Sequence, residues 1–526
     1  MTIKRAVLAL LTIFAIAQIG FSLKSSLAQP QIQSRLELYQ TNLMLHVAEF
    51  KANPTDDFDL NSAVSSLVGE DPYSAASKKY QQVRQESLVS RDNFISKLQQ
   101  LDDSQSANSE VAAKSEANIA QNNIQRQQLT QQITELEQLI NELDLKRGIL
   151  SAVQGNPEEA ISIWDQELNS IDNPRNNYAQ TASLLKQLWQ TKSELAASSG
   201  ESNVAIITNN LDSWFRYQAL AKYDQVNQLS ENLALLQAQE LKIATDSLFK
   251  LVIISGIPVF GGIGGVILLV SLIIQRFIKS ETAILATNSN TTWSTPWDWE
   301  ITWQVLIVGF FFIGQFVLPL LLGLFHINPA NSPLRIKALY VLGTYLLMAG
   351  AGISVLYFSI KSFLPLPSDW FKFQFKSNWV IWGFGGYLVA IPLVLLVSLI
   401  NQQIWQGQGG SNPLLFLALQ SQDKVALAVF FATASIAAPI FEEIMFRGFL
   451  LPSLTRYISV SGAIVISGFI FAIAHLSLSE VLPLATLGII LGFVYTRSRN
   501  LLAPMLLHCL WNSGTLLSLF VLGSGA

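Results

Sequence analysis

The chain of 526 residues has little charge, four histidines and one cysteine. Charged residues make up 13% of the sequence, about half the share found in an ordinary soluble domain. The one cysteine, Cys509, excludes an intrachain disulfide and any zinc site built from several cysteines. The formal net charge of -4 gives no electrostatic case for binding nucleic acid.

Three common hydrolase patterns are also missing from the sequence. It contains no His-Glu-x-x-His zinc helix and no Gly-x-Ser-x-Gly nucleophile turn. Residues 425–526 contain no aspartate, which excludes an aspartyl site built from a pair of aspartates in these apolar segments.

The chain does have long apolar segments after residue 248, without the period-two alternation of strands. Only helices and closed barrels can span a bilayer, so these segments predict membrane helices. The sequence therefore predicts an all-α fold with a polytopic membrane core of about eight helices, whose first part is residues 248–375. The segments run roughly over 251–274, 303–325, 338–360, 379–400, 425–441, 459–477, 483–496 and 501–522, of which 425–441 and 483–496 are short.

The first 247 residues are different in composition. Lys4 and Arg5 precede an apolar run, and Ser26-Leu27-Ala28 offers small residues at positions suited to cleavage. Residues 1–28 are therefore predicted to be a signal peptide or an uncleaved signal anchor. Residues 29–247 are polar with a helical period, and they predict a helical domain of coiled-coil or TPR-like (tetratricopeptide-like) type.

The distribution of lysine and arginine predicts the orientation in the membrane. If residues 29–247 lie outside, nine basic residues gather at cytoplasmic ends and three in the opposite short loops. We therefore expect residues 29–247 to be extracytoplasmic, and Glu442 and Glu443 to lie near the cytoplasmic end of their helix.

Three of the apolar segments carry polar groups that are costly inside a bilayer. Such groups usually have a function and a partner, so we predict a site assembled between helices. The groups are Glu442, Glu443 and Arg447 in the first segment, His475 in the second, and His508 and Asn512 in the third.

The two adjacent glutamates are predicted to have different roles. Glu443 and Arg447 are four residues apart on one helix face, carboxylate first, which favours an ion pair. Glu442 points in another direction and has no partner in its own helix. A buried carboxylate without a positive neighbour is suited to act as a general base.

The remaining groups allow two kinds of chemistry. His475 could orient a water beside Glu442, while His508 and Asn512, which share a helix face, suit a developing oxyanion. This arrangement would hydrolyse an amide. Alternatively, Glu442, His475 and His508 could hold a Zn²⁺ ion with an open coordination position.

These residues resemble the motifs of the CAAX-protease and bacteriocin-processing family of intramembrane proteases, which includes the type II prenyl-protein endopeptidases. The resemblance covers roughly residues 380–522 and rests on three motifs in the family's order, Glu442-Glu443-x-x-x-Arg447, Phe471-x-x-x-His475 and His508-x-x-x-Asn512. It implies that residues 376–526 form the protease core, with a cavity open to the cytosolic side. It also implies that Glu442 and His475 activate water, that His508 and Asn512 hold the oxyanion, and that Glu443, Arg447 and Phe471 support the site.

We therefore expect an intramembrane endopeptidase, of metallo- or glutamate type, that acts on a membrane-associated protein or peptide. The alternative is a non-catalytic membrane scaffold or immunity-type protein that binds partners through residues 29–247. A transporter is disfavoured because the two halves of the membrane part show no repeat. Residues 29–247 lie outside the resemblance, and we expect them to recruit a protein partner or substrate.

Overall fold

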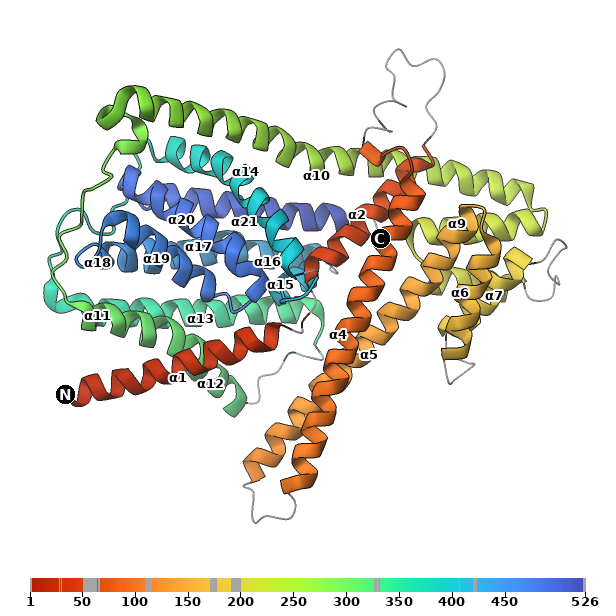
Figure 1. Ribbon diagram of the computed structural model, residues 1–526, viewed down its shortest axis with the longest axis horizontal. Coiled ribbons are helices and arrows are strands. Elements are labelled where there is room, and N and C mark those ends of the chain that lie inside the picture. The colour runs from red at the N-terminus through yellow and green to blue at the C-terminus, as the bar shows by residue number, and fades with distance from the viewer. Residues whose placement is uncertain are drawn as a thin grey trace. The chain divides into compact units, whose positions relative to one another are not determined.

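A computed structural model describes residues 2–523 except 28, 30, 51–63, 65–66, 109–115, 171–176, 191–199, 326–328, 330–331, 406 and 420–422. Its described residues are mostly helical and form no β-strand, so the predicted all-α fold is confirmed (Figure 1). The chain divides into two compact units. One comprises residues 1–27 and 254–523, and the other comprises residues 28–253.

The first unit holds the membrane helices. Within the described residues, eight helices are long and apolar enough to cross a membrane, which confirms a multi-pass membrane protein. They are α1 (Ile3–Ser26), α10 (Ser230–Lys279), the run α11 to α12 (Trp299–Leu324), α13 (Leu334–Ile360), α14 (Trp379–Trp405), the run α16 to α18 (Lys424–Leu454), α20 (Val481–Ser498) and α21 (Leu502–Gly523). A shorter apolar helix, α19 (Val460–Ile473), follows α18 and precedes α20 in the chain.

The segment predicted over 425–441 is longer in the structure than in the sequence pattern. Helix continues from Lys424 to Leu454 through α16 (Lys424–Ala432), η6 (Thr433–Ala437), α17 (Ala438–Glu443), η7 (Ile444–Leu450) and α18 (Leu451–Leu454). Glu443 and Arg447 end the apolar run in the sequence, but their side chains pair with each other and are buried. The paired charges therefore do not interrupt the helix.

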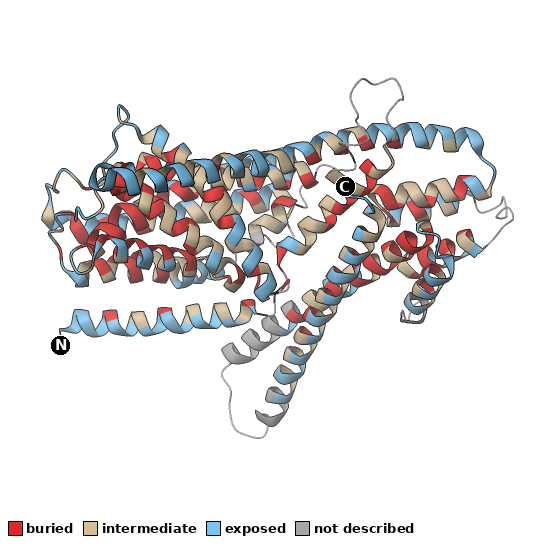
Figure 2. Ribbon diagram, turned by 45° about the horizontal axis from the view of Figure 1, so that its top comes forward, coloured by how far each residue is buried: buried red, intermediate tan, exposed pale blue. Residues whose placement is uncertain are grey.

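The interior of this unit is packed with aromatic side chains. Trp297, Phe441, Phe446 and Phe471 belong to one buried cluster, and Figure 2 shows buried residues concentrated on the inner helices. The apolar windows of α1 and α10 are mostly exposed, as expected for helices that face lipid.

Helix α1 packs against the helix run that begins with α11 (Trp299–Gln304) and η4 (Val305–Val317). Trp303 Nε1 donates to Thr12 Oγ1 at 2.8 Å, and the Phe14 and Phe316 rings lie 5.2 Å apart. Arg5 Nε lies 2.9 Å from Glu300 Oε2. An uncleaved anchor would make such contacts; Ala28, at the predicted cleavage position, lies outside the described residues.

The second unit is a helical bundle built from α2 (Ile32–Ala48), α4 (Pro72–Asn108), α5 (Glu116–Val153), α6 (Pro157–Ser170), α7 (Asn177–Gln190), α8 (Gly200–Asn210), α9 (Ser213–Val226) and the start of α10. Helices α4 and α5 lie side by side as a long hairpin (Figure 1), and Phe94, Leu129 and Leu136 pack between them. The main core contains Trp164 and Trp214. Its assignment as coiled-coil or TPR-like stays a prediction.

Candidate functional site

Glu443 and Arg447 form the centre of the polar cluster in the membrane unit. Arg447 Nη1 lies 2.7 Å from Glu443 Oε1, and both side chains are 0% exposed. The guanidinium also donates through Nη2 to the Gly488 carbonyl at 3.0 Å, and its central carbon lies 4.5 Å from the Phe471 ring centroid. A buried charge needs such compensation, so Arg447 holds this part of the site together.

The Gly488 carbonyl reaches Arg447 because α19 and α20 approach closely at two glycines. A Cβ atom on Gly488 would lie 2.9 Å from the Gly468 Cα, which is closer than real Cβ atoms come. The same Cβ would lie 3.2 Å from the Phe471 ring. Small residues at this crossing are what allow two membrane helices to pack so tightly.

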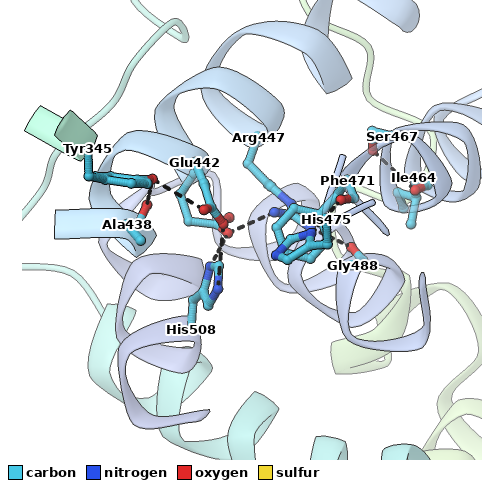
Figure 3. Close-up of polar contacts among 11 residues, drawn as sticks. Tyr345, Ala438, Glu442, Arg447, Ile464, Ser467, Phe471, His475, Gly488 and His508 are labelled. Atoms are coloured by element: carbon cyan, nitrogen blue, oxygen red, sulfur yellow. Dashed lines mark hydrogen bonds and ion pairs between the residues drawn. The ribbon is translucent and has the colours of Figure 1, made fainter. Parts of the chain in front are cut away.

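His508 joins the two glutamates from α21, and Figure 3 labels it beside Glu442. Its Nδ1 lies 2.9 Å from Glu443 Oε1, and its Nε2 lies 3.8 Å from Glu442 Oε2. A carboxylate only accepts hydrogen bonds, so Nδ1 carries the proton and donates to Glu443. The Nε2 atom therefore faces Glu442 across a distance longer than a direct hydrogen bond.

Glu442 has a partner that sequence reasoning missed. The Tyr345 hydroxyl, on α13, donates to Glu442 Oε1 at 3.2 Å and is labelled in Figure 3. A tyrosine in the middle of the apolar 338–360 segment was the available signal. It was missed because a tyrosine carries no charge and the same segment contains two others, Tyr340 and Tyr357.

His475 lies just beyond the C-terminal end of α19. Its Nδ1 is 2.9 Å from the Phe471 carbonyl, and no described hydrogen bond or ion pair joins it to Glu442. The helix ends at Ile473, and Leu476, which follows His475, adopts a left-handed backbone with φ of 59°. The predicted role of His475, to orient a water beside Glu442, stays a prediction.

Phe471 lies between the two histidines. Its ring centroid is 4.9 Å from that of His475 and 5.6 Å from that of His508, in edge-to-face arrangements. The Phe471 side chain is fully buried, so it fixes the spacing between the two imidazoles.

Asn512, one turn beyond His508, is held by an irregularity of the neighbouring helix. In η6 the Ala438 N–H bonds to the Thr433 carbonyl, five residues earlier. The same spacing from Ala434 reaches Pro439, which has no N–H, so the Ala434 carbonyl lacks that partner. Asn512 Nδ2 donates to this carbonyl at 2.7 Å.

The three predicted metal ligands Glu442, His475 and His508 do not converge. Across the described part of the chain, no three His, Cys, Asp or Glu side chains come close enough to hold a metal ion. The nearest candidate, Glu443, already shares its Oε1 between Arg447 and His508. A metal-binding role for Glu442, His475 and His508 therefore stays a prediction.

The chain is similar to known membrane proteases. It is 25% identical over 218 residues to the membrane-embedded CAAX protease MroQ of Staphylococcus aureus (strain USA300), covering 40% of this chain and 86% of MroQ. It is also 25% identical over 135 residues to YdiL of Bacillus subtilis (strain 168), whose name proposes a membrane peptidase. That match covers 26% of this chain and 54% of YdiL. No solved structure matches the chain.

The matched family lies over the polar cluster. Residues 424–514 match the family described as type II CAAX prenyl endopeptidase Rce1-like. This range contains Glu442, Glu443, Arg447, His475 and His508, together with Asn512. The C-terminal part of this multi-pass membrane protein therefore carries the match to the Rce1-like family model of type II CAAX prenyl endopeptidases.

Proposed function

We propose that the protein is an intramembrane endopeptidase that hydrolyses a peptide bond of a membrane-associated protein or peptide. The observation that carries the proposal is the pair of Glu442 and His508, which face each other at 3.8 Å between membrane helices. The Rce1-like domain supports a protease, and the similarity to MroQ supports a membrane-embedded one.

The charges of the cluster indicate how the pair is protonated. Arg447 balances Glu443, which leaves Glu442 as the second negative charge beside His508. An uncompensated charge is costly in a low-dielectric interior, so the cluster is most stable when it is neutral. Besides the proton that His508 Nδ1 donates to Glu443, Glu442 and His508 Nε2 then share one further proton.

Glu442 is the proposed general base. It takes a proton from a water molecule, the water oxygen attacks the peptide carbonyl carbon, and the carbon–nitrogen bond breaks. The proton held by Glu442 passes to the leaving amine, which yields one carboxylate and one amine. Tyr345 donates to Glu442 Oε1 and so keeps Oε2 directed toward His508.

The proposed oxyanion donors are His508 and Asn512. His508 donates through Nδ1 to Glu443, so in its protonated form the second N–H, on Nε2, is free to donate to the developing oxyanion. The Asn512 amide has two N–H groups and uses one on Ala434.

His475 is the proposed second water-orienting group. Its Nδ1 donates to the Phe471 carbonyl, so Nε2 of the neutral ring carries a lone pair that can accept a water proton. A water between His475 and Glu442 would connect the two side chains, which share no direct hydrogen bond in the described part of the chain. No step of the proposal passes through a metal.

A survey of new protein N-termini in membranes tests the function. Cells carrying the wild-type chain are compared with cells carrying Glu442→Gln at matched levels, and Glu281→Gln, an exposed glutamate, is the control. We expect a set of termini that disappears only in Glu442→Gln. Identical lists, with the variant inserted and folded, would instead favour the scaffold alternative.

We also propose that residues 29–247 recruit a protein substrate or partner. The support is that the family match covers only residues 424–514. The large helical unit therefore lies outside the matched family and has room for a separate role. Exchanging this unit for an unrelated helical domain, with the membrane core still inserted, should lower cleavage of native substrates. Unchanged cleavage would reject recruitment.

A further inference from the structure

The unit of residues 28–253 contains a serine, a histidine and a glutamate in series, which the proposed protease function does not use. His46 Nδ1 lies 2.5 Å from Glu240 Oε1, and His46 Nε2 lies 2.8 Å from Ser213 Oγ. The three residues come from α2, α10 and α9. We propose that Ser213, His46 and Glu240 form a second hydrolytic site, which cleaves small carboxylic esters by acyl transfer to Ser213.

The hydrogen bonds place the proton where a general base needs it. A carboxylate only accepts, so His46 Nδ1 carries a proton and donates it to Glu240. The Nε2 atom then has a lone pair and accepts from the Ser213 hydroxyl. A nucleophile bonded to a base, with the base oriented by a third group, is the arrangement that activates serine in hydrolases.

Burial keeps the orienting pair fixed and leaves the serine more accessible. His46 is 1% exposed and Glu240 is 3% exposed, whereas Ser213 is half-buried. A second carboxylate nearby, Glu49, is occupied elsewhere: its Oε1 accepts from the Tyr73 hydroxyl and the Trp214 indole, at 3.1 and 3.0 Å. Glu240 therefore remains the partner of His46.

The Tyr73 hydroxyl remains a donor to Glu49 over a wide pH range. Burial, and then the Glu49 carboxylate beside it, raise the pKa of Tyr73 above its ordinary value. The Gln218 side chain adds a further donor to the same Glu49 oxygen at 2.7 Å. These contacts hold the second carboxylate away from the imidazole.

Ser213 has a strained backbone at the start of a helix. Its φ of 50° lies in the left-handed region, which is uncommon for a residue other than glycine and is often found at functional positions. Ser213 is also the first residue of α9, whose first-turn N–H groups have no partner within the helix and carry partial positive charge. These N–H groups suit the oxyanion that forms when Ser213 attacks a carbonyl.

Packing alone does not account for the arrangement. The bond between His46 and Glu240 would be complete without a hydroxyl on the second imidazole nitrogen, and a serine at negative φ would avoid the strain. Ser213 has both the strained backbone and the hydrogen bond to His46 Nε2. A nucleophilic serine uses both features.

The reaction balances with water as the co-substrate. Ser213 Oγ attacks the ester carbonyl carbon while His46 Nε2 takes the hydroxyl proton; the carbon–oxygen bond then breaks, and His46 protonates the leaving alcohol. Water, deprotonated by His46, attacks the acyl group on Ser213, which releases a carboxylic acid and restores the serine. A small ester is expected because Ser213 is only half exposed and because an alkoxide leaves more readily than an amine.

The test uses the full-length protein in lipid nanodiscs with Glu442→Gln in the background, so that the membrane site does not contribute. The probes are a fluorophosphonate, with the modified residue located by mass spectrometry, and 4-nitrophenyl butyrate hydrolysis. We expect an adduct on Ser213 and a loss of hydrolysis of about 10²-fold or more in Ser213→Ala and His46→Gln. Ser230→Ala, at the exposed start of α10, is the matched control and should change neither readout.

The residue map of the Glu442→Gln protein decides the outcome even if a further variant fails to fold. Glu442→Gln protein with Ser213 and His46 intact that forms no adduct on Ser213 would overturn the proposal. An adduct that forms at the same rate in folded His46→Gln would also overturn it, because the serine would then react without its base. The background substitution makes either result independent of the proposed peptidase activity.

Discussion

Each unit of the protein has a buried pair of a histidine and a glutamate, and the two pairs differ in what lies beyond the pair. In the membrane unit, His508 pairs with Glu443, which is also bound to Arg447, and its second nitrogen faces Glu442. In the unit of residues 28–253, His46 pairs with Glu240, and its second nitrogen accepts from a neutral hydroxyl on Ser213.

The comparison shows how the surroundings determine the chemistry available to a buried pair of a histidine and a glutamate. Two carboxylates near one imidazole need a cation when they are surrounded by lipid-facing helices, and Arg447 supplies it. The proposed result is a general base that acts on water. With one carboxylate and one hydroxyl, the imidazole needs no added cation and can activate the hydroxyl itself.

Removing Arg447 should have the largest effect on the membrane pair. In Arg447→Met the buried Glu443 loses its cation, and we expect a loss of about 3–5 kcal/mol in stability. Replacing both members, as Glu443→Leu with Arg447→Met, should restore most of that loss. Thermal unfolding in nanodiscs measures both, with the exposed Lys279→Met as control. A double variant as unstable as the single one would show that the cation does not balance Glu443.

Gly488→Ala should be the next most damaging change. The added Cβ would meet the Gly468 Cα and carbonyl oxygen at 2.9 Å, and overpacking of this kind costs about 1–3 kcal/mol. It should also reduce cleavage, because the Gly488 carbonyl would move from Arg447. Gly343→Ala, on α13 with open space around its Cβ, is the matched control in the same unfolding and cleavage assays. Equal behaviour of the two variants would contradict the close helix crossing.

Tyr345→Phe removes one hydrogen bond from Glu442 and should have a moderate effect. A hydrogen bond of this type contributes about 0.5–1.5 kcal/mol, which corresponds to about a 2- to 10-fold loss in cleavage rate. Tyr357→Phe, at an exposed position of the same helix, should leave the rate unchanged. If both variants cleave at the wild-type rate, Tyr345 does not position Glu442.

Metal chelation should have the smallest effect. No group of three metal-binding side chains that could hold a metal ion is found among the described residues, so we expect cleavage after 1,10-phenanthroline treatment within about 2-fold of the untreated rate. The non-chelating 1,7-phenanthroline isomer is the control. Loss of cleavage that returns with added Zn²⁺ would establish a metalloprotease, in which the attacking water is bound to the metal.

The part of the membrane site that was predictable is local in the sequence. Glu443 and Arg447 are four residues apart, so helix geometry alone predicted their pairing. His508 and Asn512 also share a helix face. The sequence could not assign partners across helices: the hydrogen bond from Tyr345 to Glu442 was missed, and so was the contact of His508 with Glu443.

The sequence by itself determined the all-α class, the membrane helices and the residues of the polar cluster, because hydrophobic runs and charges inside them are read one segment at a time. The tertiary structure alone brought His46 to Glu240, 194 residues away, and to Ser213, 167 residues away. It also decided that His508 joins Glu442 to Glu443. Contacts over such separations depend on how helices pack, and helix packing has no signature in a single sequence.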